Sequence, residues 1–329
     1  MAAQQPTLLQ GIRNTVTADL AAVDGVVRRE LTSDVALVNQ VSEYIIGAGG
    51  KRLRPLLVLL AARAAGIGAL GPQVPGAVII EFIHTATLLH DDVVDGSHQR
   101  RGRDTANEVW GNAASVLVGD FLYSRAFQLM VKLKSLRVME IMADATNVIA
   151  EGEVLQLMNA NDPDTTEERY LEVIYRKTAR LFESGAQIAA VLAGADQRIE
   201  QALATYGRHL GNAFQLIDDS LDYRGNPAQR GKNVGDDLSE GKPTLPVIYA
   251  LKHGTPAERA LLRGAIESGG LSELAKVVQA IESAGGLQYT ARLAQREVDL
   301  ALLALEPIPD TVHVEALRQL AGFAISRSY

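Results

Sequence analysis

Hydrophobic residues recur with the period of an α-helix along almost the whole chain. In the segment 31–46 they fall three or four positions apart, and Ser33 is the expected N-cap of a helix there. Residues 76–95 predict one mostly apolar helix, of the kind that lies buried in a large α-protein. The stretches 137–158 and 168–193 have the same pattern. A helical period of this extent predicts an all-α fold.

The segments between these helices carry the usual signals of helix ends and turns. Thr165 and Glu168 predict a capping box at the start of a helix. There is no hairpin signal and no series of strands. No change in composition marks a linker, so we expect a single domain over residues 1–329, with residues 1–16 as a mobile N-terminus. Glycine-rich breaks fall at 47–50, 66–72, 225–235, 241–243 and 269–270.

Composition and charge exclude several classes of protein. The net charge is −7, from 39 acidic and 32 basic residues, whereas non-specific nucleic-acid binding calls for a basic surface. Cysteine is absent, which excludes disulfides and thiolate metal sites. No apolar run is long enough to span a membrane, and the first residues lack the build of a signal peptide. We therefore expect a cytoplasmic protein that binds no nucleic acid.

Two glycine-rich segments resemble nucleotide-binding loops, but the neighbouring residues argue against the first and the second does not match the motif. The segment "GIGALG", 66–71, matches G-x-G-x-x-G, yet it follows an Ala-rich helical run and precedes two prolines. A helix C-cap followed by a loop explains it better. The segment "GNPAQRGKN", 225–233, has one residue too many for a P-loop and Asn in place of Ser or Thr.

The chain's chemistry concentrates in two aspartate-rich motifs. Asp91, Asp92 and Asp95 lie in "LLHDDVVDG", and a second set, Asp218, Asp219 and Asp222, lies in "FQLIDDSLDY". On a helix the first and last aspartates of each set share one face, about 6 Å apart along the axis. The like charges of these aspartates repel each other, and this repulsion requires compensation. Carboxylate oxygens are hard ligands, and they suit Mg²⁺ that is bound together with phosphate oxygens. The two motifs are therefore expected to clamp a diphosphate between several metal ions.

A solvated acidic helix face is the alternative to a metal site. Such a face would explain a single aspartate motif about as well as a metal site would. Two motifs, each preceded by apolar helix, favour the metal site instead.

Basic residues near both motifs supply a complementary set of phosphate donors. His84 lies on the helical stripe that contains Thr87, Asp91 and Asp95, although a lone His on an apolar helix is more often a core residue. Arg100 and Arg101 follow the first motif and offer fork-shaped donors. Lys51, Arg52 and Arg54 follow a glycine turn, "GAGGKRLRP", whose backbone N–H groups suit an anion. Runs of charged residues are usually exposed to solvent, but acidic and basic residues that alternate around one cavity favour diphosphate binding.

The order of these motifs resembles the trans-isoprenyl diphosphate synthases. "GGKRLRP", "DDVVD…RRG", "KT" at 177–178, "FQLIDDSLD" and "GKNVGDDLSEGKPTLP" occur in the order typical of that family, and the resemblance runs from about residue 20 to the C-terminus. It is greatest to the bacterial long-chain members that make the ubiquinone side chain. The resemblance implies long helices around a deep central cavity, a homodimer and Mg²⁺ as cofactor.

The resemblance also implies a role for each matching residue, and none of these positions departs from the family pattern. Metal ligands are implied at Asp91, Asp95, Asp218 and Asp222, with catalytic support from Asp92, Asp219 and Lys177. The isopentenyl diphosphate site is implied at Lys51, Arg54, His84 and Arg101. The allylic diphosphate site is implied at Arg100, Lys177, Thr178, Gln215, Lys232 and Lys242.

Product length is expected to depend on small side chains next to the first motif. Ala86 and Thr87 stand where bulky aromatics close the cavity in short-chain members. The floor is expected deeper, at Leu129, Met130, Met139 or Met142, although a Met cluster is equally explained by core packing. The resemblance favours eight isoprene units, with nine hard to separate from it and a shorter geranylgeranyl product as a further alternative.

The implied reaction adds isopentenyl diphosphate, unit by unit, to an allylic diphosphate such as farnesyl diphosphate. The apolar product would pass to a membrane surface or to a downstream transferase. A terpene cyclase would lack the intact "DDSLD" motif and the "GGKRLRP" turn. A regulatory subunit of a heteromeric synthase usually loses one aspartate motif, and a purely structural helical protein explains neither.

Overall fold

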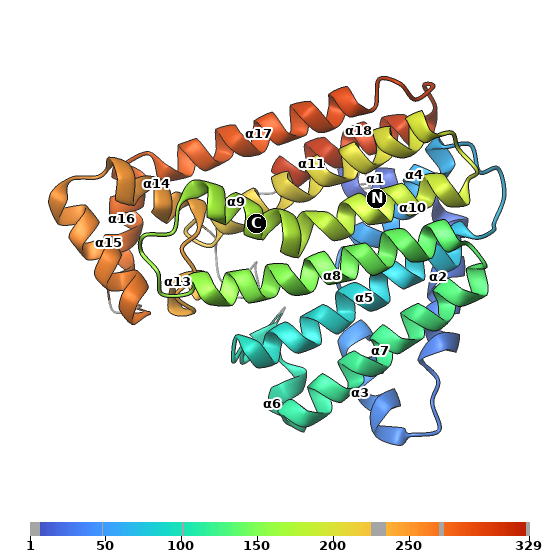
Figure 1. Cartoon of the computed structure of the whole chain (residues 1–329), viewed down its shortest axis with the longest axis horizontal. Helices are drawn as coiled ribbons and strands as arrows, with labels where there is room; N and C mark the ends of the chain where they lie inside the picture. The colour runs from blue at the N-terminus through green and yellow to red at the C-terminus, as the bar shows by residue number, and fades with distance from the viewer. Residues whose placement is uncertain (1–6, 48, 101, 225–234, 270–272, 327–329) are drawn as a thin grey trace, which may run out of the picture.

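A computed structural model describes residues 7–47, 49–100, 102–224, 235–269 and 273–326 of the chain. The fold is a single all-α domain, as predicted, in which long helices lie side by side (Figure 1). The helices are α1 (Leu8–Asn14), α2 (Thr17–Leu31), α3 (Ala36–Gly47), α4 (Leu53–Ala64), α5 (Gln73–Val94), α6 (Ala106–Trp110), α7 (Asn112–Leu133), α8 (Leu136–Asn159), α9 (Glu167–Ile174), α10 (Arg180–Leu192), α11 (Gln197–Leu221), α13 (Asp236–Ser239), α14 (Leu245–His253), α15 (Pro256–Ser268), α16 (Leu274–Ser283), α17 (Gly286–Ala304) and α18 (Val312–Ile325). A π-helical turn, η1 (Tyr175–Ala179), joins α9 to α10.

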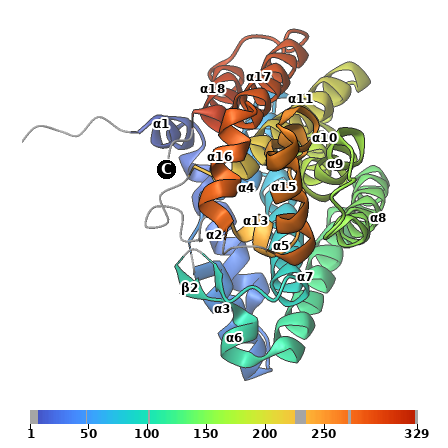
Figure 2. The ribbon, with the colours of Figure 1, turned by 90° about the vertical axis from the view of Figure 1, so that its left-hand side faces the viewer.

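The core lies where α4 and α5 meet α10. Nearly every residue of α4 is buried, because the helix is apolar on all sides and is enclosed by α5, α10 and α18. On its other side α5 packs along α7, and α10 packs along α8 and α11. Shorter helices, α14 to α16, form a second cluster of apolar contacts at one end of the molecule (Figure 2). This packing fixes α5, α8, α10 and α11 as the walls around the site described below.

Small residues allow α11 to approach its neighbours closely. A Cβ atom at Gly207 would lie 2.5 Å from the carbonyl oxygen of Phe182. One at Gly211 would lie 2.5 Å from the Cα atom of Ala179. Because α11 carries the second aspartate motif, these contacts set its distance from η1 and α10.

The N-terminal part of the chain differs from the sequence expectation. Residues 8–14 were expected in a mobile N-terminus, but they form α1, in which Ile12 is fully buried and packs with the main core. Ser33 was expected to cap a helix that contains Leu31, but Leu31 ends α2 and the next helix begins at Ala36. The Ser33 hydroxyl accepts from the N–H of Val35 in the turn before that helix. Tertiary packing, which periodicity does not report, separates the two helices.

Two other local expectations are also corrected. The segment 168–193 is not one regular helix, because η1 interrupts it. The cap of α9 is Thr166, whose hydroxyl accepts from the N–H of Arg169, and not Thr165. Where no strands were expected, β1 (Gln99–Arg100) and β2 (Arg103–Asp104) form a short antiparallel pair.

The glycine segment at 66–71 does end a helix, as expected. Helix α4 ends at Ala64, and Gly66 follows with a φ of 103°. The segment 225–233 lies outside the described residues. Among the described helices, none combines the length and the hydropathy that crossing a membrane requires.

Candidate active site

One large cavity of about 880 Å³ collects most of the residues singled out in the sequence. Its walls come from α5, α8, α9, η1, α10 and α11, together with the turn before α4 and the segment between α13 and α14. Of the predicted residues, those that line it are Lys51, Arg54, His84, Thr87, Asp91, Asp95, Arg100, Lys177, Thr178, Gln215, Asp218, Asp219, Asp222 and Lys242. Arg101 and Lys232 lie outside the described residues. Residues more than a hundred positions apart therefore meet at one site.

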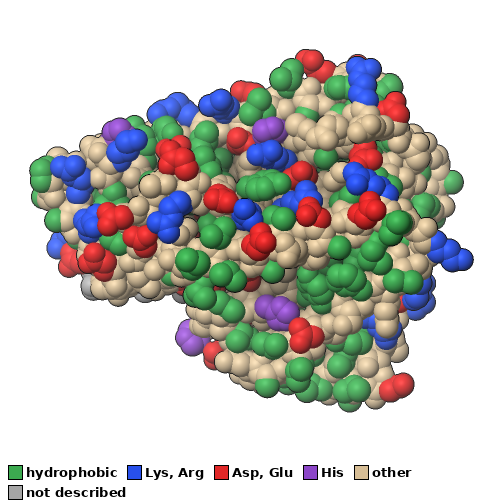
Figure 3. Space-filling view, in the orientation of Figure 1, with side chains coloured by type: hydrophobic (Ala, Val, Ile, Leu, Met, Phe, Trp, Pro, Cys, Tyr) green, Lys and Arg blue, Asp and Glu red, His purple; other side chains and the backbone are tan. Residues whose placement is uncertain are grey.

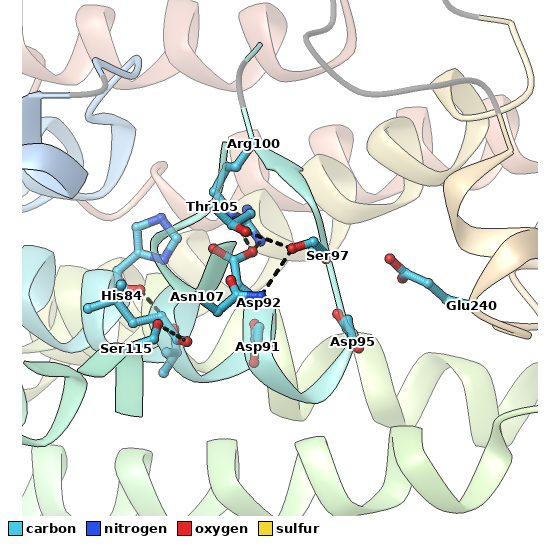
Figure 4. A network of polar contacts seen from close by, with 12 residues as sticks. His84, Asp91, Asp92, Asp95, Ser97, Arg100, Thr105, Asn107, Ser115 and Glu240 are labelled. Atoms are coloured by element: carbon cyan, nitrogen blue, oxygen red, sulfur yellow. Dashed lines mark hydrogen bonds and ion pairs between the residues drawn. The ribbon is translucent and has the colours of Figure 1, made fainter. Parts of the chain in front are cut away.

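The aspartates of the first motif divide into two groups. Asp91 and Asp95 line the cavity, as their spacing of four on α5 predicts. Asp92 is fully buried and does not line it. Figure 4 shows Asp92 turned toward Arg100, while Asp91 and Asp95 point away from that pair. Both Nε and Nη2 of Arg100 donate to the same Asp92 oxygen, at 2.9 and 2.7 Å. Asp92 thus orients Arg100, which itself reaches the cavity.

The second motif is also held by contacts within the protein, and one Asp222 oxygen accepts from the backbone N–H of Asp237 at 3.2 Å. Asp218, Asp219 and Asp222 all line the cavity, but the side chain of Asp219 is held by protein donors. The Tyr170 hydroxyl donates to one Asp219 oxygen at 2.5 Å, and the Gln215 amide donates to the other at 2.7 Å. Burial, followed by the charge of Asp237, raises the pKa of Asp219. The middle aspartate of each motif is therefore bonded within the protein.

Two lysines link the first motif to the opposite walls. Lys177, on η1, donates to Glu153 of α8 at 2.5 Å and lies 3.6 Å from Asp91. Lys242 donates to Asp95 at 2.8 Å and lies 2.6 Å from Glu240. The carboxylates around Lys242 raise its pKa above the ordinary range of lysine despite burial, so both ammonium groups remain charged beside Asp91 and Asp95. These cations offset the repulsion that the aspartates would otherwise feel.

The basic turn before α4 lies at one side of the same cavity. Gly49 and Gly50 adopt φ angles of 76° and 139°, which glycine alone adopts without strain, and they place Lys51 and Arg54 along the wall. An Nη atom of Arg54 lies 3.1 Å from Nε2 of His84. The guanidinium of Arg54 also lies 4.5 Å from the centre of the Phe182 ring. This cluster is positive and therefore suits an anion.

On α5, α8 and α11 the cavity wall changes from carboxylates to less polar side chains within about one helical turn. On α5, Thr87 and Leu88 lie about one turn from Asp91. On α8, Ile149 lies about one turn from Glu153, and on α11 Phe214 lies about one turn from Asp218. Because α5, α8 and α11 run in the same direction (Figure 1), these apolar side chains gather at the same end. A molecule with a charged head and an apolar tail matches this gradient.

Of the residues predicted to control product length, only Thr87 lines the cavity. Ala86 is fully buried on the neighbouring face of α5. Met130 and Met142 lie in the main core cluster, at 1% and 0% exposure, as does Leu129. The apolar end of the cavity is instead made by Leu88, Ile149, Leu181 and Phe214.

The donor set fits a hard divalent cation. The cavity presents the carboxylates of Asp91, Asp95, Asp218 and Asp222, which are hard oxygen ligands, whereas His84 of the same cavity lies next to Arg54. Within the described residues, no group of three or more ligands converges on a single point. That arrangement suits Mg²⁺, which binds through one or two carboxylates and takes its remaining ligands from water and phosphate.

Sequence reasoning missed several residues of the site. Glu153, Glu240 and Asp237 line or adjoin the cavity, and Tyr170 holds Asp219. Nothing in the sequence separates these carboxylates from the many on the surface. Glu153 pairs with Lys177 and Tyr170 with Asp219, 24 and 49 positions away along the chain, so only the folded structure identifies these contacts.

Comparison with known proteins places the chain among enzymes with matching sequence and fold. Residues 35–284 match the model of the polyprenyl synthetase family. The chain is 55% identical to the octaprenyl diphosphate synthase of Escherichia coli (strain K12) over 320 residues, which cover 97% of this chain and 99% of that protein. It is 47% identical to an all-trans-nonaprenyl-diphosphate synthase (geranyl-diphosphate specific) of Rhodobacter capsulatus, over 97% of this chain and 98% of that protein.

A solved structure gives the same result for the fold. The polyprenyl synthase of Caulobacter crescentus CB15, in complex with calcium and isoprenyl diphosphate, superposes with a TM-score of 0.94 at 45% identity. The superposition covers 99% of both chains.

Proposed function

Because the chain belongs to the polyprenyl synthetase family and is a long-chain trans-polyprenyl diphosphate synthase, we propose that its product has eight isoprene units and serves the ubiquinone side chain. The proposed primer is farnesyl diphosphate. The product length rests on the high identity to the octaprenyl enzyme of E. coli. One observation carries the reaction, namely a single cavity that is lined by both aspartate motifs, by basic side chains and by apolar side chains.

We assign the two diphosphate sites to opposite sets of cations. Isopentenyl diphosphate would bind at Lys51, Arg54 and His84, joined by Arg101. The allylic diphosphate would bind near the aspartate motifs, where Arg100, Lys177 and Lys242 line the cavity with Thr178 and Gln215, joined by Lys232. Enzymes of this family use divalent metal ions, and we propose Mg²⁺ at Asp91, Asp95, Asp218 and Asp222. When bound there, the metal would neutralise the negative charge that builds up on the departing diphosphate.

The protein's own groups would assist ionisation and coupling. Lys177, Lys242 and Arg100 are placed to donate to the departing diphosphate while the allylic C–O bond breaks. The double bond of isopentenyl diphosphate, held at the basic turn, then attacks the allylic cation. A proton is lost to the departed diphosphate, and the double bond forms again. Apolar side chains around the tail exclude water, which would otherwise trap the cation as an alcohol.

The alternative functions have less support than a synthase with an eight-unit product. A nine-unit product remains the second candidate, since a nonaprenyl enzyme is 47% identical. A shorter product, such as geranylgeranyl diphosphate, would require a bulky side chain at the polar end of the apolar region, where Thr87 stands. A regulatory subunit would not need both aspartate motifs, and both are intact here.

A homodimer is also proposed, through the face formed by α7 and α8. Large apolar side chains gather on that face (Figure 3). They are more than half exposed in the single chain, and such a patch is typical of an interface. Its members are Leu117, Val131, Leu136, Val154, Leu157 and Met158. Hand-off of the apolar product at a membrane surface and location in the cytoplasm stay predictions.

The decisive experiment measures product size. The purified chain is incubated with Mg²⁺, farnesyl diphosphate and labelled isopentenyl diphosphate, and the dephosphorylated products are separated by length. A Mg²⁺-dependent series ending at eight units is expected. A series ending at nine would correct the length, and one ending at three or four would contradict the long-chain assignment. No elongation by folded protein would favour the regulatory subunit.

A further inference from the structure

Lys177 reaches the cavity from the π-helical turn η1 and not from a regular α-helix. Regular helix precedes and follows the turn, and the extra residue of a π-bulge rotates the side chains that come after it. Such single turns occur frequently at functional sites. Here the turn brings Lys177 and Thr178 to the cavity wall, and it packs against α8 and α11.

Two consecutive residues of helix α8, Gly152 and Glu153, contact this turn at Lys177. A Cβ atom at Gly152 would lie 2.7 Å from the Cβ atom of Arg176 and 2.8 Å from the backbone nitrogen of Lys177. The two backbones are therefore in direct contact, and no other residue fits at Gly152 without moving η1. The next residue, Glu153, accepts from the ammonium of Lys177 at 2.5 Å.

The contact with Glu153 fixes where the ammonium points. Lys177 is a long side chain with four rotatable bonds, and its head group lies between Glu153 and Asp91, 3.6 Å from the latter. The side chains of Lys177 and Glu153 are 19% and 30% exposed, so water competes weakly for the pair. Burial raises the pKa of Glu153, and the nearby charge of Lys177 opposes this rise. The charged carboxylate of Glu153 and the charged ammonium of Lys177 therefore stabilise each other.

We propose that Gly152 and Glu153 are positioning residues, which hold the Lys177 ammonium beside Asp91, ready for the leaving diphosphate. Gly152 permits the contact between α8 and the π-helical turn, and Glu153 anchors the charged end. The inference rests on the proposed role of Lys177 at the allylic diphosphate. Its main effect is on ionisation, because an ammonium held in place stabilises the departing charge without reorganising.

The test combines Glu153→Gln with Lys177→Met in a double-mutant cycle. Glu153→Gln keeps the size of the side chain and an oxygen acceptor but removes its charge. We expect kcat to fall on the order of tenfold, from loss of one charge-assisted contact, with the KM for isopentenyl diphosphate unchanged. On the Lys177→Met background, the same change should have no further effect, because the group that it positions is gone.

Glu151→Gln is the matched control. Glu151 lies on the same helix and pairs with Arg176 of the same turn, but its side chain is 51% exposed and it does not line the cavity. It should leave kcat and both KM values unchanged. Gly152→Ala is a second variant, which displaces the turn without changing any charge, and we expect a lower kcat at an unchanged KM for isopentenyl diphosphate. The melting temperature of each variant checks that it is folded.

The outcomes separate this inference from the proposed function. A full-rate Lys177→Met variant would contradict the proposed role of Lys177. If Lys177→Met is impaired but Glu153→Gln has wild-type kinetics, the positioning role alone is wrong. Additive losses in the double mutant would also overturn it, because they would show that Glu153 acts independently of Lys177.

Discussion

At the scale of single residues, the middle aspartate of each motif is held in place by contacts within the protein. Asp92 is fully buried and bonded to Arg100, and Asp219 is held by Tyr170 and Gln215. A buried aspartate that is bonded to a cation of the protein positions that cation. We therefore infer that Asp92 orients Arg100, whereas Asp91 and Asp95, which line the cavity beside Lys177 and Lys242, are the proposed metal ligands.

Substitutions in the first motif test this division. Asp91→Asn should raise the Mg²⁺ concentration needed for half-maximal activity and reduce turnover by about a thousandfold, since a proposed metal ligand is lost. Asp92→Asn should reduce turnover by about tenfold through a loosened Arg100, with the Mg²⁺ requirement unchanged. Mg²⁺ titrations of steady-state activity measure both. An equal rise in the Mg²⁺ requirement for the two variants would show that Asp92 binds metal.

At the scale of elements, the position of the second motif depends on how closely α11 approaches η1. The motif lies at the end of α11, and that helix packs on α10 and η1 along Gly207 and Gly211. Interiors packed at this density transmit small displacements over a whole helix. The distance between the two aspartate motifs therefore depends on residues that line no part of the cavity.

Gly211→Ala tests this dependence. The new Cβ atom would lie 2.5 Å from the Cα atom of Ala179, so one backbone has to move. We expect a loss of stability of about 1–3 kcal/mol and lower turnover in the folded protein. Gly264→Ala, in the interior of α15, is the control, because no atom lies within 4 Å of its Cβ position. It should raise stability by about 0.5–1 kcal/mol without changing turnover, as measured by chemical unfolding and by assay. Unchanged stability of Gly211→Ala would contradict the close packing.

At the scale of the whole molecule, the shape of the cavity and the outer face of α7 and α8 have separate consequences. The cavity has both charged and apolar walls, so it suits a substrate with a charged head and an apolar tail. The outer face carries exposed apolar side chains that the fold of one chain leaves uncovered. The first feature predicts how far the product grows, and the second predicts how chains associate.

Thr87→Phe should shorten the product. Thr87 lines the cavity next to the apolar end, and a phenyl ring there would occupy the space of the growing tail. Product sizing should then give chains shorter than those of the wild type. Met142→Leu is the matched control, since Met142 is fully buried in the core and the change conserves volume. Unchanged length in Thr87→Phe would show that the tail does not pass this position. Ala86→Phe, predicted from the sequence to act similarly, would instead overpack the core, because Ala86 is fully buried.

Leu117→Arg should break the homodimer. Leu117 is 67% exposed on α7, and an arginine there would bury a charge in the apolar interface of both chains. Light scattering after size-exclusion chromatography should give the mass of a single chain. Leu303→Arg, on α17 and 56% exposed, lies outside this face and should stay dimeric. A dimer in both variants would contradict the proposed interface.

The sequence by itself determined the helical fold and most of the site's chemistry, because both depend on local spacing. Aspartates four apart on an apolar helix must share a face, and this holds for Asp91 with Asp95 before any tertiary contact forms. Glycines ahead of the basic residues at 51–54 indicate a turn for the same local reason. The order of these motifs along the chain was enough to identify the family, which the comparisons confirm.

Only the tertiary structure decided which side chains act together. The rotation of α5 against α4, α7 and α10 points Asp92 at Arg100 instead of into the cavity. The pairing of Lys242 with Asp95 spans 147 positions, and no local signal reports it. The periodicity does not report the π-helical turn that carries Lys177, nor its direct contact with Gly152 of α8. Spacing along a helix fixes which residues share a face, whereas packing between helices fixes what that face meets.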